Sequence, residues 1–428
     1  MDVTTSWRSR GGRMNGTLRI EQSYAPALAE ILRENLRFCR YHATHRRFIP
    51  LASLPKIDAT FSVAPRRAKG IGVDQAGRGG ASAIGRKIER IVREWRRSVA
   101  AKAFSWADTV IGETAPFIGG RAGDVLLLAG ETWSRHDFSV LRLVRQRCGM
   151  RIAAVCQDVI PAKHPQFFAA DGFAERFAGY ADFLINDVDL IIAISEQTKQ
   201  DVLDLARGRG ALHADVQTIK LGHDIGAPAP VNRPPSLAGL EPGKFVLSVS
   251  TIQSRKNFEL IYHLWQRLCA EQFPGLPKLV IAGRPGFGST DLLWQISHDP
   301  VVRDRVTVRH DLSDEALSWL YRECAFTLYP SFYEGFGLPV VESLAHGKFC
   351  IASNTPALVE AGQRLVRHID PLDFAAWRAA VVELVHSPEV VAEHERQIKM
   401  RYRSVSWAQS AQSLVALLRP LLGVQREA

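Results

Sequence analysis

The sequence repeats one local pattern: a short apolar run that ends in a glycine or a polar residue and leads into a helical pattern. These runs are GDVLLLAG (123–130), RIAAVCQDVIP (151–161), DLIIAIS (189–195), FVLSVS (245–250), KLVIAG (278–283), VTVRH (306–310) and AFTLYPS (325–331). Strands buried on both faces of a parallel sheet are continuously apolar, and strands that alternate with helices form such sheets. The pattern therefore predicts an α/β fold.

The chain is long enough for two domains. Its 428 residues allow two units of about 200 residues each. The stretch from Gly226 to Pro242 contains five prolines and no helical or strand pattern, which is typical of a linker. We predict an N-terminal domain at 1–228 with a basic insertion at 51–110, a C-terminal domain at 229–405 and a last helix at 406–428.

Composition argues against several classes of protein. The six cysteines are scattered with no C-x-x-C pair, which favours reduced thiols in the cytosol over a disulfide framework or a zinc site. The N-terminus has no apolar signal segment, and no run approaches the roughly 18 apolar residues that span a bilayer. We expect a cytoplasmic protein, with attachment to the inner face of a bacterial cytoplasmic membrane left open.

One segment holds much of the net charge of +10: between Lys56 and Lys102 there are twelve Lys and Arg residues against four acids. Residues 84–104 place Ile, Val, Trp and Phe at helical spacing, with Arg and Lys on the other faces. Such a helix fits an anionic membrane surface or a solvated face of the domain, and we leave both readings open. No fold motif or stacking platform for nucleic acid accompanies it.

The stretch from Leu328 to Glu342, LYPSFYEGFGLPVVE, predicts a strand, a glycine-rich turn and the start of a helix. Gly335 and Gly337 permit positive φ and a close approach of the backbone to a ligand. A helix that begins near Pro339 directs its N-terminal N–H groups at an anion. Glu334 and Glu342 are expected to face the same cleft.

The string EGFGLPVVE, followed by SLAHG and IASN, resembles the donor-site signature of the retaining GT-B glycosyltransferases of family four. The resemblance implies two Rossmann-like domains that face a central cleft. It also implies that a C-terminal helix, expected at Trp407–Leu422, crosses back to the N-terminal domain. No G-x-G-x-x-G follows a strand, which disfavours a dinucleotide-dependent dehydrogenase.

Site roles follow from this resemblance. Arg255 and Lys256, in an R-K-N element between a strand and a helix, would bind the donor diphosphate. Glu334 would contact hydroxyls of the donor sugar, and Glu342 would bind the ribose. These three groups, Arg255, Lys256 and Glu334, are the candidate catalytic residues. The remaining donor-binding candidates are Gly335, Phe336, Gly337, Leu338, Thr251, Gly16 (with Gly12 second) and His310.

Acceptor-side candidates come from the carboxyl ends of the N-terminal strands, where parallel sheets collect their ligands. They are Trp133, Gln157, Asp158 and Ser195, with Lys163 and His164 just downstream. The family often has His before the Asp at 158, whereas this chain has Gln157, so an imidazole role is not expected there. Asp158 has a second reading as a loop cap.

The implied reaction moves a hexose from a nucleoside diphosphate sugar to a glycan or polyprenyl-linked acceptor in surface polysaccharide synthesis, such as lipopolysaccharide or exopolysaccharide. GDP-mannose is the first choice of donor. We expect no cofactor, no metal ion and no nucleic acid partner. The alternatives are a GT-B sugar-nucleotide epimerase or soluble disaccharide synthase, and a non-catalytic sugar-nucleotide-binding protein.

The basic helix provides a first test. A transferase that works on a lipid-linked acceptor is expected to sediment with anionic vesicles and not with neutral ones, because each basic residue near the lipid contributes about 1 kcal/mol. Absence of sedimentation with anionic vesicles at low salt would favour the soluble alternatives.

Overall fold

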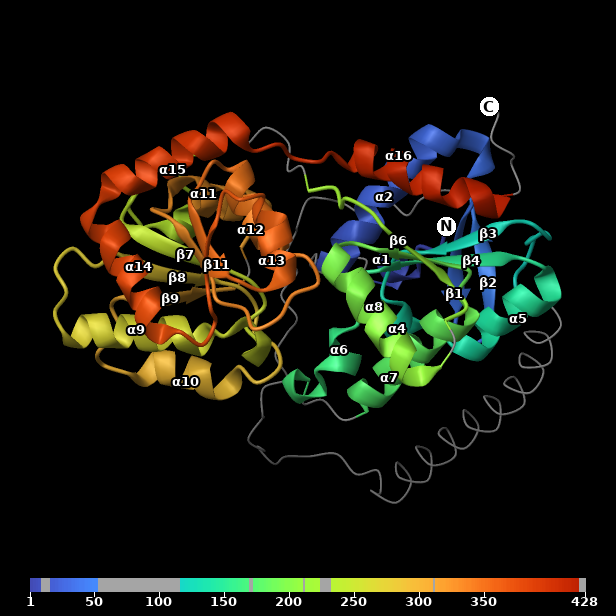
Figure 1. The fold of residues 1–428 in the computed structure, drawn as a ribbon, viewed down its shortest axis with the longest axis horizontal. Helices are drawn as coiled ribbons and strands as arrows, with labels where there is room; N and C mark the ends of the chain where they lie inside the picture. The colour runs from blue at the N-terminus through green and yellow to red at the C-terminus, as the bar shows by residue number, and fades with distance from the viewer. Residues whose placement is uncertain are drawn as a thin grey trace, which may run out of the picture.

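The computed structural model describes residues 1–8, 16–52, 116–168, 172–210, 212–223, 232–310 and 312–422. The basic helix predicted at 84–104, the glycine at position 12 and the first part of the predicted linker lie outside the described residues. The described chain forms two α/β halves, each built on a parallel sheet (Figure 1).

The N-terminal half is built on four parallel strands in the order β3-β4-β5-β6. A hairpin of β1 and β2 extends this sheet, because Asp2 bridges both Cys39 in β1 and Leu128 in β3. The strands are β1 (Phe38–His42), β2 (Arg47–Leu51), β3 (Val125–Leu128), β4 (Arg151–Cys156), β5 (Leu190–Ala193) and β6 (Asp215–Thr218). The helices are α1 (Thr4–Arg8), α2 (Gly16–Leu32), α4 (Thr132–Arg135), α5 (Phe138–Cys148), α6 (Ile160–Lys163), α7 (Phe173–Asp187) and α8 (Glu196–Arg209).

The first residues form a helix where their residue types favour a strand. Val3, Thr4 and Thr5 read as a strand, yet helix α1 begins at Thr4. The buried Asp2 carboxylate accepts a hydrogen bond from the Thr4 backbone N–H at 3.1 Å, and that of Glu21 accepts one from the Ser6 N–H at 2.6 Å. These carboxylates take up N–H groups that a short helix leaves unpaired, so the chain turns where its β-branched residues favour a strand.

The C-terminal half is a six-stranded parallel sheet in the order β12-β11-β10-β7-β8-β9. Its strands are β7 (Phe245–Val249), β8 (Lys278–Ala282), β9 (Val306–Arg309), β10 (Thr327–Tyr329), β11 (Cys350–Ser353) and β12 (Arg367–Ile369). Its helices are α9 (Phe258–Ala270), α10 (Thr290–His298), α11 (Asp314–Glu323), α12 (Leu338–Ala345), α13 (Pro356–Gly362), α14 (Phe374–His386) and α15 (Pro388–Arg401).

The order of this sheet positions the candidate site. The chain runs outward from β7 through β8 and β9, and then returns to place β10 on the other side of β7. Such a reversal opens a crevice beyond the carboxyl ends of the two neighbouring strands, where ligands of open α/β sheets bind. Arg255 and Lys256 follow β7, and Glu334 follows β10, so the topology brings them to one crevice.

The last helix, α16 (Trp407–Leu418), crosses back to the N-terminal half, as predicted (Figure 1). Its Trp407 ring lies edge-on against Tyr24 of α2, with 5.3 Å between ring centroids. The Tyr24 and Ser410 hydroxyls are 2.7 Å apart, and Ser410 donates to the Lys220 carbonyl at 2.8 Å. The N-terminal core is thus completed by residues from the end of the chain.

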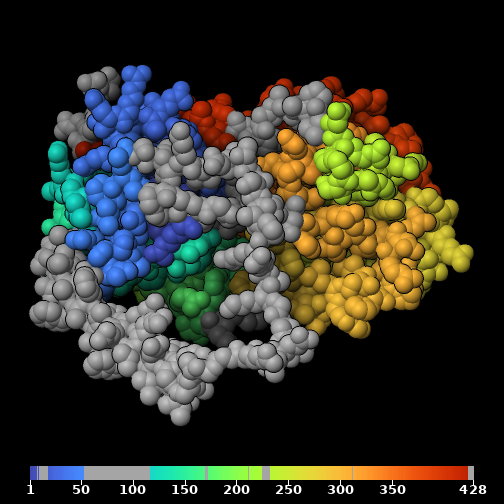
Figure 2. All heavy atoms as spheres, turned by 180° about the vertical axis from the view of Figure 1, so that it is seen from behind, coloured from blue at the N-terminus to red at the C-terminus, as the bar shows by residue number. Residues whose placement is uncertain are grey.

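The same two halves are visible from behind in Figure 2, with blue residues on one side and orange residues on the other. Within the described part of the chain, no helix combines the length and the apolar character needed to cross a bilayer.

Two glycine substitutions test the crossing of α16. A Cβ on Gly222 would lie 2.6 Å from the Trp407 ring and 2.8 Å from its Cα, whereas a Cβ on Gly208, in α8, meets nothing within 4 Å. We expect Gly222→Ala to lower the free energy of unfolding by about 1–3 kcal/mol through overpacking. Gly208→Ala should raise it by about 0.5–1 kcal/mol, because alanine is the better helix residue. Denaturant unfolding measures both, and a neutral Gly222→Ala would contradict this packing.

Candidate functional site

The crevice beyond β7 and β10 holds two cations on one carboxylate. Arg255 and Lys256 lie in a short 3₁₀ turn (Ser254–Lys256) between β7 and α9, and Glu334 lies in the loop between β10 and α12. Arg255 Nη1 donates to Glu334 Oε2 at 2.8 Å, and Lys256 Nζ donates to Glu334 Oε1. Their side chains are only 10–12% exposed, so the cluster is nearly buried. The predicted catalytic residues are therefore in contact.

Burial and neighbouring charges shift the pKa values of this cluster. Burial raises the pKa of Glu334, but Lys256 and Arg255 together outweigh it and bring that pKa down to about 2. Burial, and then the charge of Arg255, lower the pKa of Lys256 to about 8 against the attraction of Glu334. Asp158, a second carboxylate, lies close enough for its charge to act on Lys256 as well. Two neighbouring cations can together bind an anion.

Glycine is needed at two positions of the loop, Gly335 and Gly337, for different structural reasons. A Cβ on Gly335 would lie 2.5 Å from the Gln157 carbonyl oxygen and 3.0 Å from Asp158 Cβ, so the loop packs directly on the end of β4. Gly337 precedes α12 with φ of +114°, a conformation that side chains disfavour. The Gly335 carbonyl also accepts hydrogen bonds from Ser195 Oγ at 2.5 Å and Thr198 Oγ1 at 3.1 Å.

The predicted acceptor-side residues fall into two groups. Gln157 and Asp158 lie at the end of β4 beside Gly335. Gln157 Nε2 donates to the Ala129 carbonyl at 3.2 Å, and Asp158 Oδ1 accepts the Ile160 N–H at 3.0 Å, so Asp158 does cap its own loop. Burial raises the pKa of Asp158, against the charge of Arg255.

Trp133 lies elsewhere: its ring packs on Phe177 and Tyr180, with centroids 5.5 and 5.6 Å away. These aromatic rings belong to the core between α4 and α7. Trp133 was a candidate because it follows a strand, but it lies in α4 and its packing in the core explains an aromatic side chain there.

The remaining donor-side candidates lie at the ends of elements around the crevice. Thr251 follows β7, His310 follows β9, and both are exposed. Gly16 is the first residue of α2. Phe336 and Leu338 are half-buried and contact the N-terminal core.

Two interdomain groups were missed by the sequence reading. Tyr333, next to Glu334, donates to Asp201 Oδ1 at 2.6 Å and accepts from Gln197 Nε2 at 2.6 Å. The Lys163 ammonium also binds Asp201, and the His164 ring lies 4.5 Å from that of Tyr333. The sequence did offer one signal for Tyr333: it lies next to Glu334 in the stretch LYPSFYEGFGLPVVE.

Arg19 is the second missed group, and its Nη1 donates to Glu342 Oε1 from the first turns of α2. Nothing local in the sequence pairs an arginine at position 19 with a glutamate 323 residues later.

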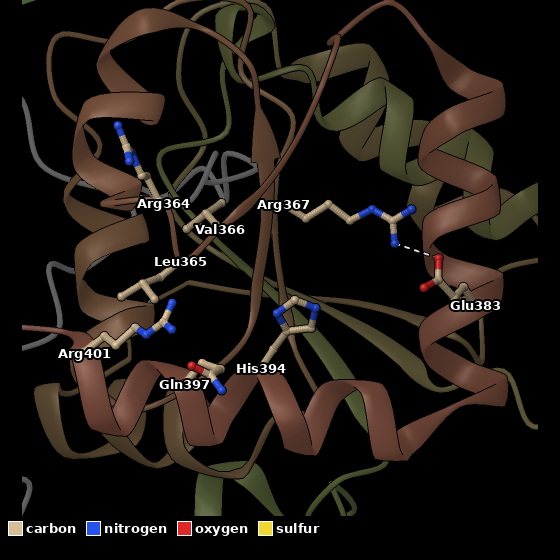
Figure 3. A pocket seen from close by; sticks show the side chains of 8 residues that line it. All are labelled: Arg364, Leu365, Val366, Arg367, Glu383, His394, Gln397 and Arg401. Carbon is tan, nitrogen blue, oxygen red and sulfur yellow. Dashed lines mark hydrogen bonds and ion pairs between the residues drawn. The ribbon is translucent and has the colours of Figure 1, made fainter.

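A cavity of about 540 Å³ lies away from this crevice, next to Arg364–Arg367 at the amino end of β12 (Figure 3). Arg367 Nη1 binds Glu383 Oε2 at 2.7 Å. Figure 3 shows the guanidinium groups of Arg364 and Arg367 pointing in different directions. Because its cations do not converge, we do not assign the cavity to the candidate site.

Comparisons with known proteins agree with the geometry. Residues 235–403 match the family described as glycosyl transferases group 1, a range that contains Arg255, Lys256, Glu334 and Glu342. The serotype-specific mannosyltransferase WbdA of Escherichia coli is 24% identical over 359 residues, which are 81% of this chain and 42% of that protein. The O-antigen chain mannosyltransferase B of Escherichia coli is 31% identical over 139 residues, 32% of this chain and 36% of that protein.

The chain spans about two fifths of the length of these relatives. Among solved structures, Anabaena HepE in complex with UDP and glucose superposes with a TM-score of 0.51 at 15% identity, covering 69% of this chain and 78% of that chain. These matches confirm the GT-B fold and the predicted resemblance to this class of glycosyltransferases.

The lowered pKa of Lys256 predicts a pH-dependent anion site. Inorganic diphosphate should bind progressively more weakly as the pH rises through about 8, because Lys256 then loses its proton and the crevice loses a cation. Arginine at position 256 stays charged over this pH range, so any change in affinity of Lys256→Arg reports the titration of the diphosphate itself. The difference in affinity between the two proteins therefore reports the loss of the Lys256 proton. Calorimetry from pH 7 to 9.5 measures it, and parallel curves would contradict the assignment.

Proposed function

We propose that this chain, whose residues 235–403 carry the match to group 1 glycosyl transferases, is a retaining, metal-independent hexosyltransferase. It moves a hexose, with mannose as the first choice, from a nucleoside diphosphate sugar to a hydroxyl of a glycan or lipid-linked glycan in surface polysaccharide synthesis. Mannose and this pathway rest on the two mannosyltransferase relatives. The observation that carries the proposal is the contact of Arg255 and Lys256 with Glu334 at the interdomain crevice.

The difficult step is separation of a diphosphate from an oxocarbenium-like sugar. Negative charge develops on the leaving diphosphate, and prearranged cations in a nearly buried site stabilise it strongly. Arg255 and Lys256 provide two such cations, and the N-terminus of α12, which begins at Leu338, adds backbone N–H groups. In this proposal no metal ion is required.

Glu334 holds these cations in place and contacts donor hydroxyls. A carboxylate with a pKa of about 2 is a weak base and a weak nucleophile, since its negative charge is already compensated by two cations. This argues against a double displacement through Glu334. It favours attack on the face from which the diphosphate leaves, with that diphosphate accepting the proton of the acceptor hydroxyl.

The acceptor would enter over the carboxyl ends of β4 and β5. Asp158 lies there beside Gly335, close enough to Arg255 and Glu334 for their charges to act on its pKa. Lys163 and His164 flank Tyr333, the neighbour of Glu334, and line the same entrance.

Alanine variants test the assignment. Glu334→Ala, Lys256→Ala and Glu342→Ala should each lower sugar transfer by about 100-fold or more while remaining folded, because each removes a group that binds the donor or its leaving group. Lys244→Ala and Glu241→Ala, at exposed positions before β7, serve as controls and should keep full activity. A purified-protein screen against GDP, UDP, dTDP and ADP sugars identifies the donor for the assay. Full activity of Lys256→Ala would remove the leaving-group argument.

A further inference from the structure

An ion pair joins the first helix of the N-terminal half to the donor side of the C-terminal half. Arg19 lies in the first turns of α2, three residues after Gly16, and its Nη1 donates to Glu342 Oε1 in α12. The Glu342 side chain is 8% exposed and that of Arg19 is 31% exposed. The attraction of Glu342 raises the pKa of Arg19 further above its ordinary value.

The second oxygen of Glu342 is held from its own half. Tyr321 Oη donates to Glu342 Oε2 at 2.8 Å, and Tyr329 Oη donates to Tyr321 Oη at 3.4 Å. Burial raises the pKa of both tyrosines well above the ordinary value, so both hydroxyls stay protonated and act as donors. One carboxylate is therefore fixed by a donor from each half of the protein.

These two hydrogen bonds do not use the full acceptor capacity of the Glu342 carboxylate. A carboxylate has about four acceptor positions, and Arg19 and Tyr321 occupy one on each oxygen. The positions that remain suit two neighbouring hydroxyl groups, such as those of a ribose. Because the carboxylate cannot turn without losing one of its two bonds, its orientation depends on the position of α2.

We propose that Arg19 is a positioning residue: it orients Glu342 for the ribose of the donor, so that nucleoside binding on the C-terminal half depends on a residue of the N-terminal half. This inference rests on the proposed function and adds a residue outside the matched range of 235–403. Arg19 acts through Glu342 and not by contact with the phosphates, and this distinction is measurable.

Calorimetric titration with nucleotides tests it. Arg19→Gln should bind a nucleoside monophosphate and a nucleoside diphosphate about tenfold more weakly than the wild type, a coupling of about 1.4 kcal/mol within one hydrogen-bond network. The loss should be equal for the two ligands and should vanish for a nucleotide without ribose 2′- and 3′-hydroxyls. It should also vanish in the Glu342→Gln background.

Kinetics and control variants complete the test. With the donor sugar, Arg19→Gln should raise KM while kcat changes little, because the interaction is the same before and in the transition state. Arg19→Lys should restore part of the affinity, and Arg33→Gln, at an exposed residue just after α2, should behave as wild type.

The outcomes separate this inference from the proposed function. If the wild type binds nucleotides and Arg19→Gln binds them equally well, or loses affinity only for the diphosphate, the positioning role is wrong and the transferase proposal stands. If the wild type binds no nucleotide and transfers no sugar, both fall.

Discussion

A carboxylate held between two buried cations is the interaction on which this site depends. Bringing Arg255, Lys256 and Glu334 out of water is costly, and the attraction within the cluster offsets that cost only when the geometry is good and the charges balance. Burial, and then the charge of Arg255, lower the pKa of Lys256 in this cluster. Two nearly buried cations that lie side by side can bind an anion, which is the basis of the proposed function.

The cluster exists only because the loop that carries Glu334 is held by the opposite half of the protein. Ser195 and Thr198 bind the Gly335 carbonyl, and Tyr333 binds Asp201. Arg19 holds Glu342 from the same side. The region around Glu334 and Glu342 is thus shaped by N-terminal residues, and a movement of one half relative to the other would change the orientation of these carboxylates.

Much of the architecture was predictable because it depends on local patterns. Continuous apolar runs predicted β3, β4, β5, β7, β8, β9 and β10, whereas β6 was not predicted. The last helix was expected at Trp407–Leu422, and α16 covers Trp407–Leu418. At the start of the chain a distant group overrides the local preference of β-branched residues for a strand, because Glu21 of α2 accepts a hydrogen bond from the Ser6 N–H of α1. Trp133 shows the same limit, because an aromatic side chain after a strand suits a ligand site and a core equally well.

The sequence alone determined the α/β class, because that follows from repeated local patterns. It also determined the R-K-N element after β7 and the Glu-Gly-x-Gly loop after β10, since each is a contiguous string with its own backbone and charge requirements. Only the tertiary structure decided that β10 pairs with β7, and hence that Glu334 reaches both cations. It alone paired Arg19 with Glu342 across 323 residues. The reason is physical: strand order and the packing of two halves depend on contacts between segments far apart in the chain, and no local spacing records which of them meet.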